Sequence, residues 1–154
     1  MYQKILVPLD GSKLAECVVE HVKSIATGCQ VPTVVLLRVV KPIDVLPEFP
    51  DKAIVDDFLD ADKKAHDEAK NYLSEMSEKL KSEGIAVETD ITDGLPAEQI
   101  LRYAEERGFD LIVMSTHGRS GASRWFFGSV ADRVVRQSLT PVLTVTPSGC
   151  RIRK

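Results

Sequence analysis

Five short apolar runs, separated by stretches with helical or loop patterns, constrain this chain more than any other feature of its sequence. The runs span residues 4–9, 33–40, 85–91, 110–115 and 141–145. After Thr33, every residue of the second run, TVVLLRVV, is apolar except Arg38. This pattern is typical of a parallel strand covered on both faces. Strands that alternate with helices in this way predict an α/β fold with a mostly parallel sheet.

Helical spacing of apolar residues occupies most of the stretches between these runs. It predicts a first helix after Ser12, which can cap it, and a long helix whose apolar face runs through residues 61–80. Pro96 suits the first turn of a third helix, and a fourth should begin near Gly128. Residues 42–58 contain three prolines and predict a loop or a lid.

Length and charge bound the class of protein. A chain of 154 residues predicts one domain, which we place at residues 1–147, followed by a tail at 148–154. The formal net charge of −3 gives no general attraction to nucleic acid or to anionic membranes. No apolar run approaches the roughly 18 residues that a membrane span needs. No secretory signal begins the sequence, so we expect a cytoplasmic protein with neither nucleic acid nor membrane as a partner.

Two strand ends carry conspicuous polar residues. Asp10 follows the first run directly, and the stretch STHGRSGASRWFFGS at 115–129 follows the fourth. In open α/β folds, ligands bind at the carboxyl ends of the strands, where the strand order reverses. The two segments are therefore candidates for one ligand site.

The glycine-rich stretch suits a phosphate group. Gly128 and Ser129 fall where the fourth helix should begin, and a helix start offers unpaired N–H groups and partial positive charge. Gly118 and Gly121 would let the preceding loop fold round the same anion. The alternative is that the glycines only form turns and that Ser129 only caps the helix. Neither G-x-x-x-x-G-K-[ST] nor a G-x-G-x-x-G following a strand is present.

Taken together, these segments resemble the universal stress proteins, specifically their ATP-binding subgroup. That subgroup is marked by Gly-x-x-Gly, nine further residues and then Gly-Ser or Gly-Thr. Gly118, Gly128 and Ser129 match this pattern, and Ser115 stands at the position of its first glycine. Further matching segments are those at residues 4–12, 94–96, 114–121 and 140–145.

The resemblance implies both a fold and a ligand. The fold would be a three-layer α/β sandwich with a five-stranded parallel sheet of order 3-2-1-4-5, Rossmann-like and similar to the adenine-nucleotide α-hydrolases. The ligand would be ATP or AMP, with or without Mg²⁺ or Mn²⁺. Its phosphates would be held by Gly118, Gly128 and Ser129, and Ser115 would lie close to the ribose or the phosphates. Family members usually form homodimers, here through the last strand, and a protein partner is unknown.

The same resemblance implies the residues around the base and the sugar. Asp10 would face the ribose or an associated metal ion, and Val39 would contact adenine through its backbone. Met114 would line the base pocket. Pro8 and Gly94 would shape the wall of that pocket.

The leading hypothesis is therefore a regulatory module of the stress response that binds an adenine nucleotide without rapid catalysis. One alternative is a slow ATP-hydrolysing enzyme of the adenine-nucleotide α-hydrolase-like type. Those enzymes carry Ser-Gly-Gly-x-Asp-Ser after the first strand, which the segment 9–12, LDGS, lacks. Another alternative is a dimerisation module that binds no nucleotide. His117 has no orienting carboxylate or nucleophile near it in the sequence, so no catalytic residue is predicted.

Overall fold

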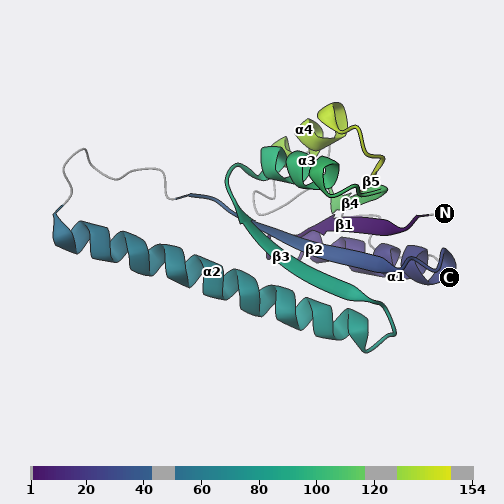
Figure 1. Ribbon diagram of the computed structural model, residues 1–154, viewed down its shortest axis with the longest axis horizontal. Coiled ribbons are helices and arrows are strands. Elements are labelled where there is room, and N and C mark those ends of the chain that lie inside the picture. The colour runs from purple at the N-terminus through teal and green to yellow at the C-terminus, as the bar shows by residue number, and fades with distance from the viewer. Residues whose placement is uncertain (1, 43–50, 117–127, 147–154) are drawn as a thin grey trace.

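The computed structural model describes residues 2–42, 51–116 and 128–146. Five strands form one sheet in which every neighbouring pair is parallel, in the order β3-β2-β1-β4-β5 (Figure 1). The strands are β1 (Lys4–Pro8), β2 (Thr33–Val40), β3 (Val87–Asp93), β4 (Leu111–Ser115) and β5 (Val142–Val145). The predicted α/β sandwich and its strand order are confirmed.

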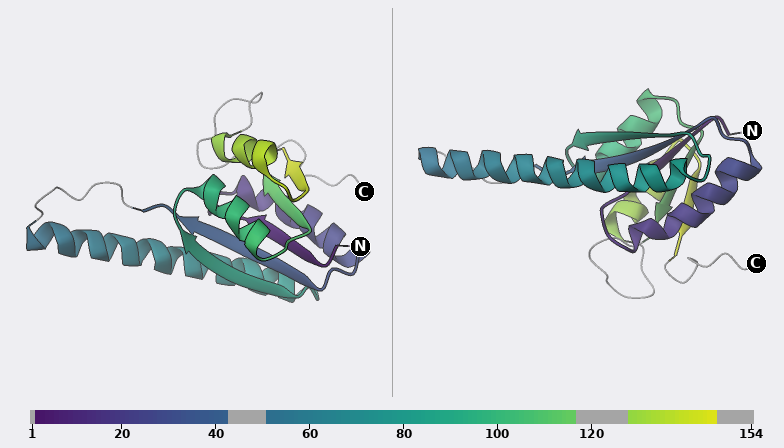
Figure 2. Two further views of the ribbon diagram at one scale, coloured as in Figure 1. Left: turned by 45° about the horizontal axis from the view of Figure 1, so that its top comes forward. Right: turned by 90° about the horizontal axis from the view of Figure 1, so that it is seen from below.

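Helices cover both faces of the sheet (Figure 2). On one face lie α1 (Val19–Gly28), which follows a short 3₁₀ turn at Ala15–Val18, and the C-terminal half of α2 (Lys52–Lys81). On the other face lie α3 (Pro96–Glu106) and α4 (Ser129–Gln137). The hydroxyl of Ser12 accepts a hydrogen bond from the N–H of Ala15 at 3.1 Å, so Ser12 closes the turn that leads into the 3₁₀ helix. By contrast, α1, which the sequence predicts Ser12 to cap, begins only at Val19 without a side-chain cap.

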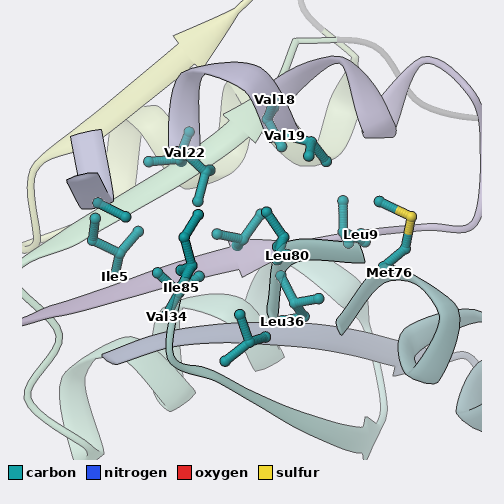
Figure 3. Packing of buried hydrophobic residues seen from close by; sticks show 14 of the residues in the cluster. Ile5, Leu9, Val18, Val19, Val22, Val34, Leu36, Met76, Leu80 and Ile85 are labelled. Carbon is teal, nitrogen blue, oxygen red and sulfur yellow. The ribbon is translucent and has the colours of Figure 1, made fainter. Parts of the chain in front are cut away.

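The central strands are buried on both faces because successive side chains of a strand point to opposite sides. Along β2, Val34 and Leu36 belong to the apolar core under α1 and α2, whereas Val35 and Leu37 belong to the core under α3 and α4. None of these four side chains is more than 2% exposed. Figure 3 shows the first of the two cores, in which Leu80 of α2 points towards the sheet.

The prediction of a loop over residues 42–58 is wrong from residue 52 onwards, and residues 43–50 lie outside the described part of the chain. The helix begins early because Asp51 caps it: its carboxylate accepts a hydrogen bond from the N–H of Ile54 at 3.0 Å. Within α2, buried side chains occur only from Ala69 onwards, and the N-terminal half projects beyond the sheet (Figure 1).

The third strand lies two residues later than predicted. The N–H of Ile85 bonds to the carbonyl of Leu80 at 3.2 Å, so this residue still closes the end of α2, and the ladder with β2 begins at Val87. As expected of a half-exposed edge strand, β3 has β2 as its single strand neighbour among the described residues and carries the exposed side chains of Glu88 and Thr89. In the described residues, no helix has the length and apolar character that a membrane span requires.

Candidate functional site

A cavity of about 630 Å³ opens at the carboxyl ends of β1, β2 and β4. Its floor comes from the residues that end these three strands, and its walls come from α2, α3 and the start of α4. The strand order reverses at β1, because β2 lies on one side of it and β4 on the other. Small-molecule ligands of open α/β folds bind at such a reversal, and the volume falls within the usual range of their pockets.

The turn after β1 fixes the carboxylate of Asp10. Its Oδ1 accepts hydrogen bonds from the backbone N–H of Ser12 at 2.9 Å and from the Ser12 hydroxyl at 2.6 Å. Gly11, between them, has a φ of +80°, a conformation that glycine adopts without strain. The turn therefore presents an oriented acceptor group at the cavity.

Arg38 reaches the same turn from β2. Its Nη1 donates a hydrogen bond to the carbonyl of Leu9 at 3.3 Å, and its guanidinium lies 3.5–3.7 Å from where a Cβ on Gly11 would stand. Arg38 and Lys41 both line the cavity, as does Asp10. The cavity therefore offers cationic donors beside an anionic acceptor, a combination that suits a ligand with hydroxyl and anionic groups.

The junction between β4 and α4 forms the opposite side. The N–H of Thr116 bonds to the carbonyl of Val145 at 3.0 Å, and the N–H of Gly128 bonds to the carbonyl of Thr116 at 2.7 Å. The first intrahelical bond of α4 runs from the N–H of Asp132 to the carbonyl of Gly128. The N–H groups of residues 129–131 precede that bond, and all three residues line the cavity. They form the anion-attracting end of the helix.

One face of α2 forms the remaining wall. Ala65, Glu68, Ala69 and Tyr72 line the cavity at the i, i+3, i+4 and i+7 positions of a single helical face. The two alanines leave room for a ligand because their side chains are only methyl groups. Burial is the main reason that the pKa of Tyr72 lies above its ordinary value, so the phenol is a neutral donor.

Most of the residues proposed from the sequence meet at this cavity. Those that line it are Pro8, Asp10, Val39, Met114, Ser115, Gly128 and Ser129. Gly94 is not among the lining residues; it lies behind them, where its N–H donates to the carbonyl of Val40 at 3.0 Å. Gly118 and Gly121 lie outside the described residues, as does His117.

The role of Asp10 as a metal ligand stays a prediction. Within residues 2–42, 51–116 and 128–146, no group of three or more His, Cys, Asp or Glu side chains could hold a metal ion. A single carboxylate suits a cation that arrives with a nucleotide, because Mg²⁺ is commonly held by one or two carboxylates together with phosphate oxygens.

Sequence reasoning missed the contribution of α2 and the charge of Arg38. Arg38 did leave a signal, since it is the single charged residue in an otherwise apolar strand. Tyr72 left none, because an aromatic on the apolar face of a helix usually packs in the core. It does pack against that core, but it also lines the cavity.

His66 joins the cavity wall of α2 to the end of β3. Its Nδ1 lies 2.9 Å from the backbone carbonyl of Asp62, and its Nε2 lies 2.9 Å from Oδ1 of Asp93. The hydrogen bond to Asp62, with the charges of Asp93 and Asp62, raises the pKa of His66 above 6.5, while partial burial opposes this. Both ring nitrogens face acceptors, so the imidazolium form fits this position best.

We therefore expect the stability that His66 contributes to depend on pH. A raised folded-state pKa means that the contribution is complete below the unfolded pKa, at about 6.5, and is lost as the pH rises through the folded-state value. The urea midpoint of the wild type minus that of His66→Gln should be largest at about pH 5.5 and should shrink towards pH 8.5. Asp93→Asn should reduce this pH dependence without abolishing it, because the bond to the carbonyl of Asp62 remains. A difference that grows with pH would contradict the assignment.

Comparison with known proteins identifies the family of the chain. A model of the universal stress protein family matches residues 1–146. The chain belongs to the universal stress protein family. Its relative MJ0577 of Methanocaldococcus jannaschii is 33% identical over 155 residues, which cover 94% of this chain and 95% of that protein. The solved structure of MJ0577 superposes with a TM-score of 0.82 at 32% identity, covering 100% of this chain and 99% of that one.

Two more distant solved structures share the family fold. A universal stress protein in complex with cAMP has a TM-score of 0.65 at 24% identity, covering 95% of this chain and 98% of that one. A family protein from Arabidopsis thaliana with AMP bound has a TM-score of 0.64 at 17% identity, covering 94% of this chain and 91% of that one. At these identities the likeness shows the fold alone.

Proposed function

We propose that this chain is a cytoplasmic regulatory module of the stress response that binds ATP or AMP, without rapid catalysis. The observation that carries the proposal is the meeting of Asp10 and the N-terminus of α4 in one cavity at the strand reversal. A carboxylate suits ribose hydroxyls and a helix N-terminus suits phosphates. Family membership and the nucleotides bound to two proteins of the same fold support the same ligand class.

The chemistry of the lining residues suggests how the nucleotide lies. Val39, Ile100 and Met114 make one part of the lining apolar, as a purine ring requires. Asp10 follows β1, which lies between β2 with Val39 and β4 with Met114, and it would accept from the ribose. The phosphates would extend to the N–H groups of residues 129–131 and the Ser129 hydroxyl. A Mg²⁺ or Mn²⁺ ion would be carried by the phosphates, with Asp10 as its protein ligand.

Isothermal titration calorimetry with ATP and with AMP tests the proposal. We expect saturable heat with at least one of them, together with a rise in melting temperature at saturating nucleotide. An absence of both effects at millimolar nucleotide would favour a dimerisation module without a ligand. Release of phosphate from ATP at several turnovers per second, abolished by Asp10→Ala, would instead establish an enzyme.

We further propose that the module is a homodimer through β5. This strand ends the sheet, so its outer edge has no strand neighbour among the described residues. Leu143 on the strand is 37% exposed, and Leu139 just before it is 86% exposed. Unpaired edges and exposed apolar side chains are typical of surfaces that become covered. Sedimentation equilibrium should give twice the chain mass for the wild type, and a Leu143→Asp variant should be monomeric.

A further inference from the structure

We propose that Tyr72 recognises a ribose hydroxyl of the bound nucleotide, so that the site prefers ribonucleotides to deoxyribonucleotides. The inference rests on the proposed function and adds a specificity-determining residue to it. It comes from α2, an element that contains none of the residues expected at the site from the sequence.

The position of Tyr72 is held by the packing of α2. Its neighbour Leu73 is 1% exposed and Leu80 is fully buried, so the helix is anchored against the sheet next to the cavity. Ala65 and Ala69 precede Tyr72 on the lining face and add only methyl groups to this wall. The large side chains of the wall are those of Glu68 and Tyr72.

The hydroxyl of Tyr72 is the polar atom that needs an explanation. It is buried, and it has no hydrogen-bond partner among the described residues. Buried polar groups are nearly always paired, so an unpaired one calls for a partner such as a ligand, an ion or an ordered water. Tyr72 lines the cavity, and binding would require a rotation about its Cα–Cβ bond to expose the oxygen, since rotation about Cβ–Cγ leaves the oxygen in place. Such a movement breaks no hydrogen bond to a described residue.

The charges around the phenol indicate what it would bind. Glu16 and Asp10 both lie close enough to raise its pKa, and Arg38 lies close enough to oppose them. Asp10 and Tyr72 both line the cavity. A carboxylate can only accept hydrogen bonds, whereas a neutral phenol can donate one. Two adjacent hydroxyls of a ribose can satisfy both, because one donates to the carboxylate while the other accepts from the phenol.

Tyr72→Phe tests the proposal because it removes only the oxygen. We expect its affinity for ATP to fall about fivefold, as for one hydrogen bond. The wild type should bind ATP more tightly than 2′-deoxy-ATP or 3′-deoxy-ATP, and in the variant this preference should disappear for one of the two analogues. The analogue for which it disappears identifies the ribose hydroxyl that Tyr72 contacts. The melting temperature of the nucleotide-free variant should be unchanged or higher, because an unpaired buried group is removed.

Tyr103→Phe is the matched control. The hydroxyl of Tyr103 donates to Oδ2 of Asp90 at 2.7 Å, and this residue does not line the cavity. Its loss should lower the melting temperature of the nucleotide-free protein and leave the affinity for ATP unchanged. The two Tyr→Phe variants should therefore show opposite patterns of stability and binding.

Two outcomes overturn the inference while leaving the proposed function intact: unchanged ATP affinity in Tyr72→Phe, or an equal loss of affinity for ATP and both deoxy analogues. A lower melting temperature of nucleotide-free Tyr72→Phe, comparable with that of Tyr103→Phe, would show a structural role instead. If wild-type protein gives no heat with any of the three nucleotides, the proposed function fails and the inference fails with it.

Discussion

A Gly128→Val variant should keep its fold and lose ATP affinity by about 30-fold, equivalent to about 2 kcal/mol. Gly128 precedes α4 with φ −58° and ψ 150°, backbone angles that valine adopts readily, and its N–H bond to Thr116 does not involve the side chain. The two added methyl groups would stand at the cavity next to the N–H groups of residues 129–131. Phosphate could then no longer approach these donors.

Calorimetry would measure the loss, and circular dichroism would confirm the fold. Gly28→Val is a suitable control, because Gly28 ends α1 away from the cavity and a Cβ added there meets no atom within 4 Å. Gly128→Ala should give a smaller loss than Gly128→Val, since it adds one methyl group. Unchanged ATP affinity in a folded Gly128→Val protein would remove the assignment of α4 as the phosphate site.

Leu80→Ala should lower the free energy of unfolding by about 3 kcal/mol, within the usual range for a leucine removed from a core. Leu80 is fully buried and packs in the core under α1 and α2, near Val34 and Leu36 of β2 (Figure 3). Deleting its side chain removes apolar contacts and leaves a cavity that the close-packed strands cannot collapse to fill. Urea unfolding followed by circular dichroism would measure the change.

The matched control is Leu59→Ala in the projecting half of the same helix. Leu59 is 63% exposed, so the same deletion should change the free energy of unfolding by less than about 0.5 kcal/mol. Equal losses at positions 59 and 80 would contradict the division of α2 into an anchored half and a projecting half. Because domains are stable by only about 5–15 kcal/mol, the loss at Leu80 should be easy to detect.

The sequence predicts the sheet well because the apolar pattern of a buried parallel strand is strong. The run at residues 33–40 matches β2 at both ends, and its alternate residues divide between two cores as parallel strands require. Boundaries that depend on a single local contact were harder to predict. The start of α2 depends on the cap from Asp51, and the start of β3 depends on the bond from Ile85 back to the helix.

In the candidate site, too, some residues could be predicted from the pattern of strands and helices and others could not. Asp10 and Ser129 could be predicted because they follow strands or begin helices, and parallel topology brings such positions to one edge of the sheet. The contribution of Tyr72 could not. Helical periodicity identifies the face of the helix on which a residue lies but not how far along the sheet the residue lies, and this distance decides whether a core residue such as Tyr72 also reaches the cavity.

The long helix has the shape of a lever, with its C-terminal half anchored on the sheet and its N-terminal half projecting beyond it (Figure 1). Lys52, at its projecting end, lies about 30 Å along the axis from Tyr72, at about 1.5 Å per residue. The anchored half packs on the sheet, so a small tilt of the cavity wall pivots there and is magnified at the far end. A tilt of about 5° would move Lys52 by about 2.5 Å over that length. The displacement caused by any tilt of the anchored half would therefore be largest at the projecting end of α2.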